Sequence, residues 1–475
     1  MKKLQAVLAA FLATALLPCV ALAAEGHPSI PGATLPVYWV IPFVCMLLSI
    51  AIMPLATPHF WEHHFGKISV FWGLAFLVPC LVVFGFNVAL YEFLHIILLD
   101  YIPFIVLLFS LFTVAGGVRL TGTLVGTPTV NTGLLAVGTV LASWMGTTGA
   151  AMLLIRPLLR ANAHRKYRMH SVVFFIFLVA NIGGSLTPLG DPPLFLGFLK
   201  GVTFFWTTSY LFVKTLILSV ALLTIYLILD NILFRKEGSP TPPQKPDAAG
   251  EKLGLDGKIN LLLLLGVVLA VLLSGLYPLG VLLEVFGIPI EGQNLLRDLA
   301  LLGIAGLSLK LTSTRCRELN DFSWAPIQEV AKLFFGIFLS MIPAIAILRA
   351  GTEGALAPLI QMVSQDGQPV NTMYFWLTGM LSSFLDNAPT YLVFFNTAGG
   401  DAQHLMYDIP TTLTAISAGA VFMGANTYIG NAPNFMVRSI AENQGVRMPS
   451  FFGYMLWSGG ILIPLFVLLT WLFFI

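Results

Sequence analysis

An aspartate and an asparagine interrupt a strongly apolar stretch in the second half of the chain. The sequence SSFLDNAPTYLVFF, residues 382–395, places Asp386 and Asn387 inside a run long enough to span a bilayer. An ionised carboxylate at that depth costs at least about 2.5 kcal/mol and marks an ion pathway by default. Carboxylate and amide oxygens suit Na⁺, and the same partly desolvated carboxylate could bind H⁺ instead. One group that binds either ion is the minimum chemistry of cation/proton exchange; the alternative is that Asp386 caps a helix N-terminus.

Two further polar motifs repeat at a fixed spacing. GSLTPLGDPPLF (184–195) and GANTYIGNAPNF (424–435) share Gly, Thr, Gly, Pro and Phe at positions 240 residues apart, which aligns Asp191 with Asn431. The same offset aligns SWMGTTGAAML (143–153) with the Asp386 motif. Apolar matches mean little in a membrane protein, but two polar motifs at one offset indicate an internal repeat rather than chance.

Prolines and glycines in these motifs are incompatible with continuous helices. The segment 181–193, NIGGSLTPLGDPP, and its counterpart in 424–433 therefore predict broken helices. At membrane depth, non-helical backbone is tolerated only where it lines a cavity, and its free carbonyls and helix ends can hold ions. The polar tips at 143–153 and 383–393 predict re-entrant hairpins; the alternative is an ordinary span with a polar kink.

These motifs supply the candidate binding residues. The candidate ion or substrate ligands are Thr147, Thr148, Thr187, Asp191, Asp386, Asn387, Asn426, Thr427 and Asn431. Asp386 and Asn387 are the candidate Na⁺ ligands. Asp191 fits a ligand or a turn equally well, and hydrogen bonding of a threonine hydroxyl back to its own helix is the simpler explanation for any one threonine.

The elements that must position these residues are transmembrane helices. The 475-residue chain is 57% hydrophobic and 10% charged, whereas a soluble domain carries about 25% charged residues. The fold class is therefore an all-α polytopic membrane protein, and the net charge of +2 with no recognition motif excludes a nucleic-acid partner. Apolar runs are expected near 36–56, 70–96, 101–118, 132–155, 171–199, 208–234, 259–279, 298–311, 326–348, 373–397, 409–436 and 452–475.

The runs fall into two halves behind an N-terminal signal. Two lysines, about a dozen apolar residues and Ala21-Leu22-Ala23 predict a signal peptide; the alternative is an uncleaved first span. The expected organisation is a signal peptide at 1–24, a first transmembrane half at 25–234, a cytoplasmic linker at 235–258 and a second half at 259–475. Cleavage would leave the mature N-terminus in the periplasm of a bacterium, with the protein in the inner membrane.

Lys and Arg distribution predicts the relative orientation of the halves. Residues 156–170 carry five Lys or Arg, and the Pro-rich linker also carries five, so both are expected in the cytoplasm. Residues 277–294 carry none and are expected in the periplasm. The counterpart of the first segment, 396–410, also carries none. The halves are thus predicted to be inverted repeats, a common layout of secondary transporters.

The motifs FTVAGGVRLTG (112–122), SWMGTTGAAMLL, SSFLDNAPTYL and GANTYIGNAPNF resemble those of the ion transporter superfamily. It includes citrate and dicarboxylate carriers, arsenite permeases and NhaD-type Na⁺/H⁺ antiporters, and a citrate transporter-like subfamily fits best. The resemblance covers most of residues 36–475 and implies inverted repeats, re-entrant hairpins, broken helices and an elevator-type homodimer. Dicarboxylate carriers show Ser-Asn-Thr at both tips. Here the tips are Gly146-Thr147-Thr148 and Asp386-Asn387-Ala388, closer to the NhaD and arsenite members.

The function predicted first is a Na⁺/H⁺ antiporter. The nearest alternative is a Na⁺- or H⁺-coupled citrate or other carboxylate transporter, which the absence of Lys and Arg from the site motifs slightly disfavours. Glu329 and Lys332, one helical turn apart, are expected to pair near a span end. An intramembrane aspartyl protease would need two close aspartates, but PLGD and FLDN do not match the two motifs of that protease family. A passive channel is a further alternative, but an inverted repeat favours alternating access. We expect no enzyme activity and no cofactor, with small ions and membrane lipid as partners.

Overall fold

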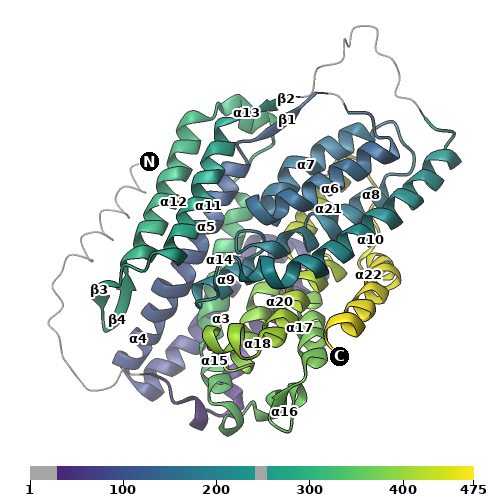
Figure 1. The fold of residues 1–475 in the computed structure, drawn as a ribbon. Helices are drawn as coiled ribbons and strands as arrows, with labels where there is room; N and C mark the ends of the chain where they lie inside the picture. Colours follow the sequence, from purple (N-terminus) through teal and green to yellow (C-terminus); the bar gives the residue numbers. More distant parts are fainter. Residues whose placement is uncertain (1–28, 123, 241–253) are drawn as a thin grey trace.

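The structure is a computed structural model that describes residues 29–122, 124–240 and 254–475 (Figure 1). The predicted signal peptide at 1–24 and most of the predicted linker at 235–258 lie outside the described residues. The described chain is mostly helical, which confirms the all-α polytopic class. Seven described helices are long and apolar enough to cross a membrane, or up to eight if a bent pair is one span.

One set of helices, here called the framework helices, packs mainly within itself. Its members are α2 (Ile41–Ala56), α3 (Pro58–Phe84), α4 (Phe86–Ile96), α5 (Ile102–Ala115), α11 (Ile259–Leu276), α12 (Gly292–Leu311) and α14 (Ala325–Ser340). A π-helical turn, η3 (Ile97–Tyr101), joins α4 to α5. In Figure 1, α5, α11 and α12 run side by side along one edge of the molecule.

A second set, here called the site helices, carries all the polar motifs. Its members are α6 (Pro128–Met145), α7 (Thr147–Ala161), α8 (Met169–Leu178), α9 (Pro192–Leu199), α10 (Trp206–Lys236), α17 (Asn371–Phe384), α18 (Asn387–Thr397), α20 (Pro410–Met423), α21 (Ala432–Asn443) and α22 (Phe451–Phe473). Short helical turns, η4 (Ile182–Leu186) and η6 (Gly424–Asn426), lie in the breaks between α8 and α9 and between α20 and α21.

The remaining elements are short and lie in connections. The helical ones are η1 (Gly32–Thr34), η2 (Val37–Val40), α13 (Thr314–Leu319), α15 (Ile342–Arg349), η5 (Gly351–Glu353), α16 (Ala357–Val363) and α19 (Ala402–Tyr407). The strands form antiparallel pairs: β1 (Arg119–Thr121) with β2 (Gly254–Asp256), β3 (Val281–Val285) with β4 (Ile288–Glu291), and β5 (Ser364–Gln365) with β6 (Gln368–Pro369).

Close packing of α3 on α14 positions one wall of the site. Gly73 lies against Leu339, and the Ser69 hydroxyl accepts a hydrogen bond from the Gly336 N–H at 3.0 Å and donates one to the Lys332 carbonyl oxygen. Small residues one to two turns apart let helix backbones approach, and a hydroxyl can bond across the gap. The two helices run parallel, so their N-terminal turns lie at the same end of the molecule.

Several predicted boundaries differ from the structure. The apolar run expected at 70–96 is two helices, because α3 begins earlier, at Pro58, and the chain breaks at Gly85, where φ is +86°. The linker is structured at its ends: α10 continues to Lys236, and β2 pairs with β1. The charged residues of the linker mark where the apolar run ends. Backbone hydrogen bonds do not depend on apolar side chains, so α10 and the β1–β2 pair extend into the charged sequence.

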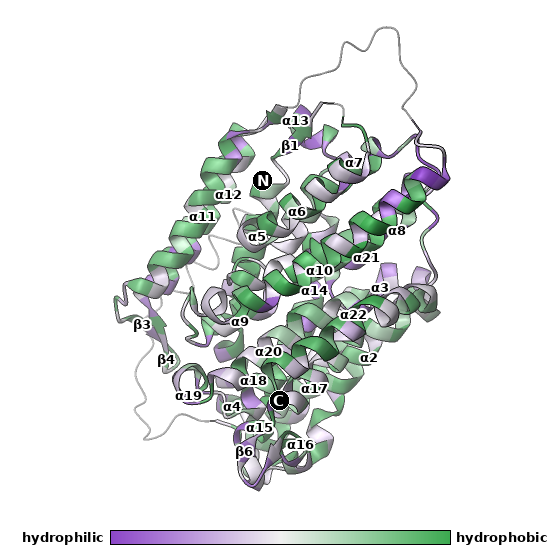
Figure 2. Ribbon diagram, turned by 45° about the vertical axis from the view of Figure 1, so that its right-hand side comes forward, coloured by the Kyte–Doolittle hydropathy of each residue, from purple (hydrophilic) through white to green (hydrophobic). Residues whose placement is uncertain are grey.

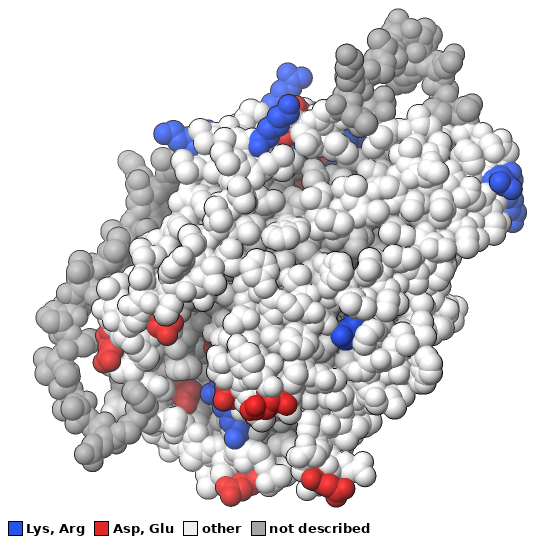
Figure 3. Space-filling view, in the orientation of Figure 1, with Lys and Arg blue, Asp and Glu red and all other residues white. Residues whose placement is uncertain are grey.

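Charge and hydropathy separate along the helix direction. Figure 2 shows hydrophilic residues mainly at the ends of the helices and hydrophobic residues between them. In the face of Figure 3, Lys and Arg gather at the upper end, where Figure 1 places α13 and the β1–β2 pair, and Asp and Glu gather toward the lower end. The predicted basic segment 156–170 runs from the last turns of α7 to the start of α8 and belongs to this basic end.

Candidate functional site

Two helical hairpins and two broken helices meet at the candidate site. Helix α6 ends at Met145, and Gly146, at φ +80°, turns the chain directly into α7, which packs back on α6. That backbone conformation favours glycine because it has no Cβ. Helix α17 ends at Phe384, and Asp386 caps α18, which packs on α17. The helices are broken where predicted, and prolines from these motifs lie at the start of α9 and α21, where a missing N–H costs nothing.

Asp191 is the centre of a hydrogen-bond network that joins both halves of the chain. Its side chain is 1% exposed. One carboxylate oxygen, Oδ1, accepts from the Thr147 hydroxyl and from Asn431 Nδ2, each at 3.0 Å. The other, Oδ2, accepts from Asn387 Nδ2 at 2.5 Å. No Lys, Arg or His among the described residues forms an ion pair with it, so three neutral donors alone solvate a buried carboxylate.

Asp386 lies at the wall of a cavity and also caps a helix. Its Oδ1 accepts from the Ala388 N–H at 3.1 Å, which is the capping role considered as the alternative. The side chain is only partly buried, and it lines the same cavity as Asp191. A single backbone donor leaves most of the acceptor capacity of this carboxylate free for an ion.

The two threonines at the repeated positions make matching hydrogen bonds. The Thr187 hydroxyl donates to the Ser143 carbonyl oxygen and accepts from Leu189 N–H at 3.2 Å. The Thr427 hydroxyl donates to the Ser383 carbonyl oxygen, and the Ile429 N–H donates to it at 3.2 Å. Both hydroxyls therefore tie a break to the end of a hairpin helix, and neither bonds back to its own helix.

Glycines allow the two breaks to fold tightly. A Cβ at Gly190 would collide with the Gly184 carbonyl oxygen, and a Cβ at Gly430 would collide with that of Gly424. The Gly190 carbonyl oxygen in turn accepts from the Thr147 N–H at 2.8 Å. The glycines at the repeated positions are thus required by close backbone approach, and they bring the first hairpin tip against the first break.

Buried asparagines complete the network. Asn431 Nδ2 donates to the Ala180 carbonyl oxygen at 3.1 Å as well as to Asp191. Asn426 Nδ2 donates to the Ser383 hydroxyl at 2.9 Å. Among the described residues, the amide oxygens Oδ1 of Asn387 and Asn426 are buried without a hydrogen-bond partner. A buried, unpartnered acceptor is costly, and a bound cation would satisfy it.

The cavity lies between the framework helices and the site helices. It has a volume of about 710 Å³. Its lining runs from the tip residues Thr147, Thr148 and Asp386 to the first turns of α3 and α14. Those turns lie at the end of the molecule that carries α13 and the basic residues, so the cavity extends toward that end.

The ionisable residues that line the cavity are mostly acidic. They are Glu62, Asp191, Glu329 and Asp386, with Lys332 the one basic residue among the described lining residues. The predicted Glu329–Lys332 ion pair is absent from the ion pairs of the described residues; the Lys332 ammonium instead lies 5.3 Å from the centre of the Phe65 ring. A cavity of this charge attracts cations.

Sequence reasoning missed several residues of this region. Glu62 and Asn434 carried no prediction, and Lys332 was expected at a span end, away from the site motifs. Asn434 accepts from Asn181 Nδ2 at 2.7 Å and donates to the Thr427 carbonyl oxygen at 2.9 Å, so it holds the second break in place. The only signal in the sequence was its position in GNAPNF, three residues after the predicted ligand Asn431.

Comparison with known protein families assigns the chain to a family. The sequence model of a family described as "Putative citrate transport" matches residues 32–474. The chain belongs to this family. The predicted resemblance to the citrate transporter-like branch of the ion transporter superfamily is therefore confirmed. No curated protein matches the chain.

Membership of the citrate transport family supports a secondary transporter. It agrees with the apolar helices that could span a membrane and with a cavity that reaches polar residues at helix breaks. Family membership does not separate citrate transport from Na⁺/H⁺ exchange, because both are secondary transport.

Proposed function

We propose that this member of the citrate transport family is a Na⁺/H⁺ antiporter of the bacterial inner membrane. The observation that carries the proposal is the charge of the cavity, where four carboxylates face one lysine. A multivalent carboxylate substrate would be repelled by this lining, whereas Na⁺ would be concentrated in it. Two of the four carboxylates, Asp191 and Asp386, belong to the site helices and have no basic partner among the described residues.

The exchange site uses Asp386 as the group that binds either ion. Na⁺ is held by oxygen atoms. The candidates are the Asp386 carboxylate, which lines the cavity, and the buried Oδ1 of Asn387 and of Asn426, which have no hydrogen-bond partner among the described residues. Protonation of Asp386 removes the charge that holds Na⁺, and Na⁺ binding releases the proton. Asp191 stays in contact with both hairpin tips through Thr147 and Asn387, so it couples the site to the first half.

Movement of the site helices against the framework helices would carry the site across the membrane. The matched breaks and hairpins, 240 residues apart, support an inverted repeat with re-entrant hairpins, and the cavity between the two helix sets supports an elevator motion of one set. The basic end faces the cytoplasm under the positive-inside rule, so the cavity is open inward. The working unit is a homodimer, as the resemblance implies.

The test uses inverted membrane vesicles from an antiporter-deficient bacterial host, acidified inside and loaded with a fluorescent ΔpH probe. Addition of Na⁺ or Li⁺ should give dequenching that depends on the protein, because the cation entering the vesicle drives H⁺ out. Choline chloride at equal ionic strength and vesicles without the protein are the controls. Absence of a protein-dependent response to either cation would contradict the proposal.

A coupled carboxylate transporter is the second candidate. Lys332 favours it, because its ammonium lines the cavity and is the one described lining group that could pair with an anionic substrate. Protein-dependent uptake of labelled citrate into right-side-out vesicles, with no response to cation alone, would select this function. Asp386 would then be a ligand of the coupling ion.

A further inference from the structure

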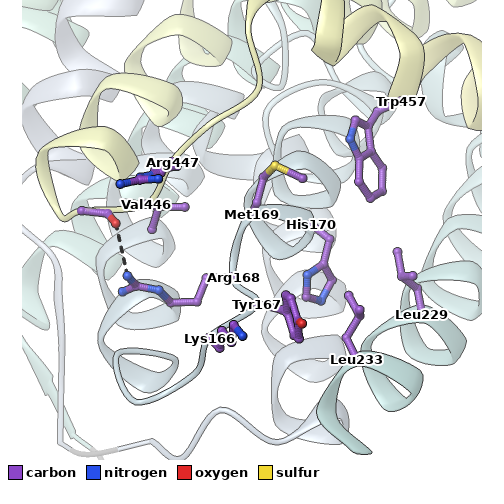
Figure 4. Close-up of a pocket in the computed structure, with 11 residues that line it drawn as sticks. Lys166, Tyr167, Arg168, Met169, His170, Leu229, Leu233, Val446, Arg447 and Trp457 are labelled. Carbon is purple, nitrogen blue, oxygen red and sulfur yellow. Dashed lines mark hydrogen bonds between the residues drawn. The ribbon is translucent and has the colours of Figure 1, made fainter. Parts of the chain in front are cut away.

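A second cavity, of about 520 Å³, lies at the basic end of the molecule and shares no lining residue with the site cavity. Three elements form it: the segment 166–170 before and at the start of α8, the last turns of α10, and the 445–457 segment that leads from α21 into α22. Figure 4 shows Arg168 and Arg447 on one side and Leu229, Leu233 and Trp457 on the other. The cavity thus has one basic wall and one apolar wall.

The polar side is basic and lacks a counter-charge among the described residues. Lys166, Arg168 and Arg447 line it, and no Asp or Glu does. Arg168 is held in place by donating to the Gly445 carbonyl oxygen at 3.2 Å. Lys166 and Arg447 are exposed and form no described ion pair.

Nearby carboxylates are already paired with other groups. Asp230 forms an ion pair with Arg165, whose Nη2 lies 2.7 Å from Oδ1, and contacts the His170 ring nitrogen Nε2 at 2.8 Å, beneath the pocket. Glu237 accepts from Arg165 at 2.8 Å. Both carboxylates are almost fully buried within these contacts. Arg165, His170 and backbone N–H groups thus already engage both carboxylates, and the basic rim retains its attraction for an anion.

The apolar side continues onto exposed apolar side chains of α10 and α22. Leu229 and Leu233 lie one turn apart on α10, next to the exposed Ile228 and Ile232. Trp457, on α22, follows the exposed Leu456. A tryptophan at a helix end is typical of the membrane interface, where an apolar ring can sit beside polar headgroups.

We propose that this pocket binds an anionic phospholipid, with the phosphate against Lys166, Arg168 and Arg447 and the start of the acyl chains against α10 and α22. Basic pockets between membrane helices at the cytoplasmic end recognise anionic headgroups. A soluble phosphate would use the basic rim alone and gain nothing from the apolar wall. The division of the pocket into a basic and an apolar side is what favours a lipid.

The test titrates the purified full-length chain in detergent with phosphatidylglycerol, phosphatidylcholine of the same acyl chains, and glycerol phosphate, and follows bound ligand by native mass spectrometry. The pocket variant is Lys166→Gln with Arg447→Gln, since both side chains are exposed and their loss leaves the Arg168 contact intact. We expect phosphatidylglycerol affinity to fall on the order of 25-fold, roughly fivefold for each basic residue removed. The unchanged elution volume of the variant would show that it is folded.

The matched control is Lys310→Gln with Arg315→Gln, which removes the same charge from exposed positions on α12 and α13, outside the pocket. This control should bind phosphatidylglycerol like the wild type. Equal affinity of the pocket variant and the wild type would overturn the proposal, as would an equal loss in the control pair, which indicates general surface attraction. Glycerol phosphate binding as tightly as phosphatidylglycerol would assign the pocket to a soluble anion instead.

Discussion

Replacing Asp386 by Asn should reduce Na⁺-dependent dequenching to the level of vesicles without the protein. The amide can still cap α18, because Asn is as good an N-cap residue as Asp, so the loss is that of a charged ion ligand. Such a loss costs on the order of 2–3 kcal/mol, which lowers ion affinity roughly 30- to 150-fold. Removal of the titrating group should also uncouple any residual Na⁺ movement from H⁺.

Asp401 provides a matched control for this substitution. It caps α19 as Asp386 caps α18, accepting from the Gln403 N–H at 2.9 Å, but it is exposed and lines neither cavity. Asp401→Asn should exchange Na⁺ for H⁺ at the wild-type rate. Exchange by Asp386→Asn at that same rate would show that the cavity carboxylate is only a helix cap.

Replacing Asp191 by Asn should stop exchange while leaving the fold almost intact. The new amide would donate where Asp191 Oδ2 accepted, and Asn387 can turn its amide so that its Oδ1, unpartnered among the described residues, accepts that bond. The three hydrogen bonds of residue 191 are then kept while its negative charge is lost. The turned amide places Asn387 Nδ2 where its unpartnered Oδ1 had been, so the number of unpartnered buried atoms is unchanged and Oδ1 is withdrawn from the proposed Na⁺ site. We expect transport at background level, with an unfolding temperature in detergent within a few degrees of the wild type.

Comparison of Asp191→Leu with Asp191→Asn separates the effect of losing the charge from the effect of losing the hydrogen bonds. Leucine leaves Thr147, Asn387 and Asn431 without their shared acceptor, at a cost of roughly 1–3 kcal/mol for each buried donor. Its unfolding temperature should therefore fall well below that of Asp191→Asn. If Asp191→Asn transports normally, Asp191 only holds the hairpin tips together, and its charge has no part in exchange.

The helical class and the positions of the helix breaks could be predicted because they depend on local sequence. Long apolar runs define membrane helices, and Gly146, Pro192 and Pro433 stand where helices end or start. The predicted polar motifs do meet: Thr147, Asp191, Asn387 and Asn431 share one network. The fixed offset of 240 residues was the signal that linked them.

Contacts between distant helices could not be read in the same way. Glu62 and Lys332 enter the cavity because α3 packs parallel to α14, which depends on the fit of Gly73 and Gly336 with facing side chains. No periodicity within either helix reveals its partner. Asp191 was equally consistent with a turn and a ligand. In the structure it is the N-cap residue of α9, while its side chain accepts from three donors on other elements. The position of Asp191 before a proline depends on local sequence, whereas its three donors depend on tertiary packing.

Competition between Na⁺ and H⁺ for one carboxylate is the central claim, and proton release measures it directly. Purified protein in weakly buffered detergent near neutral pH would receive NaCl or choline chloride while a pH indicator reports released protons. We predict protons released by Na⁺ and not by choline, and a release that is lost in Asp386→Asn and kept in Asp401→Asn. Wild-type protein that releases no protons on addition of Na⁺ or Li⁺ would contradict cation/proton exchange at this site.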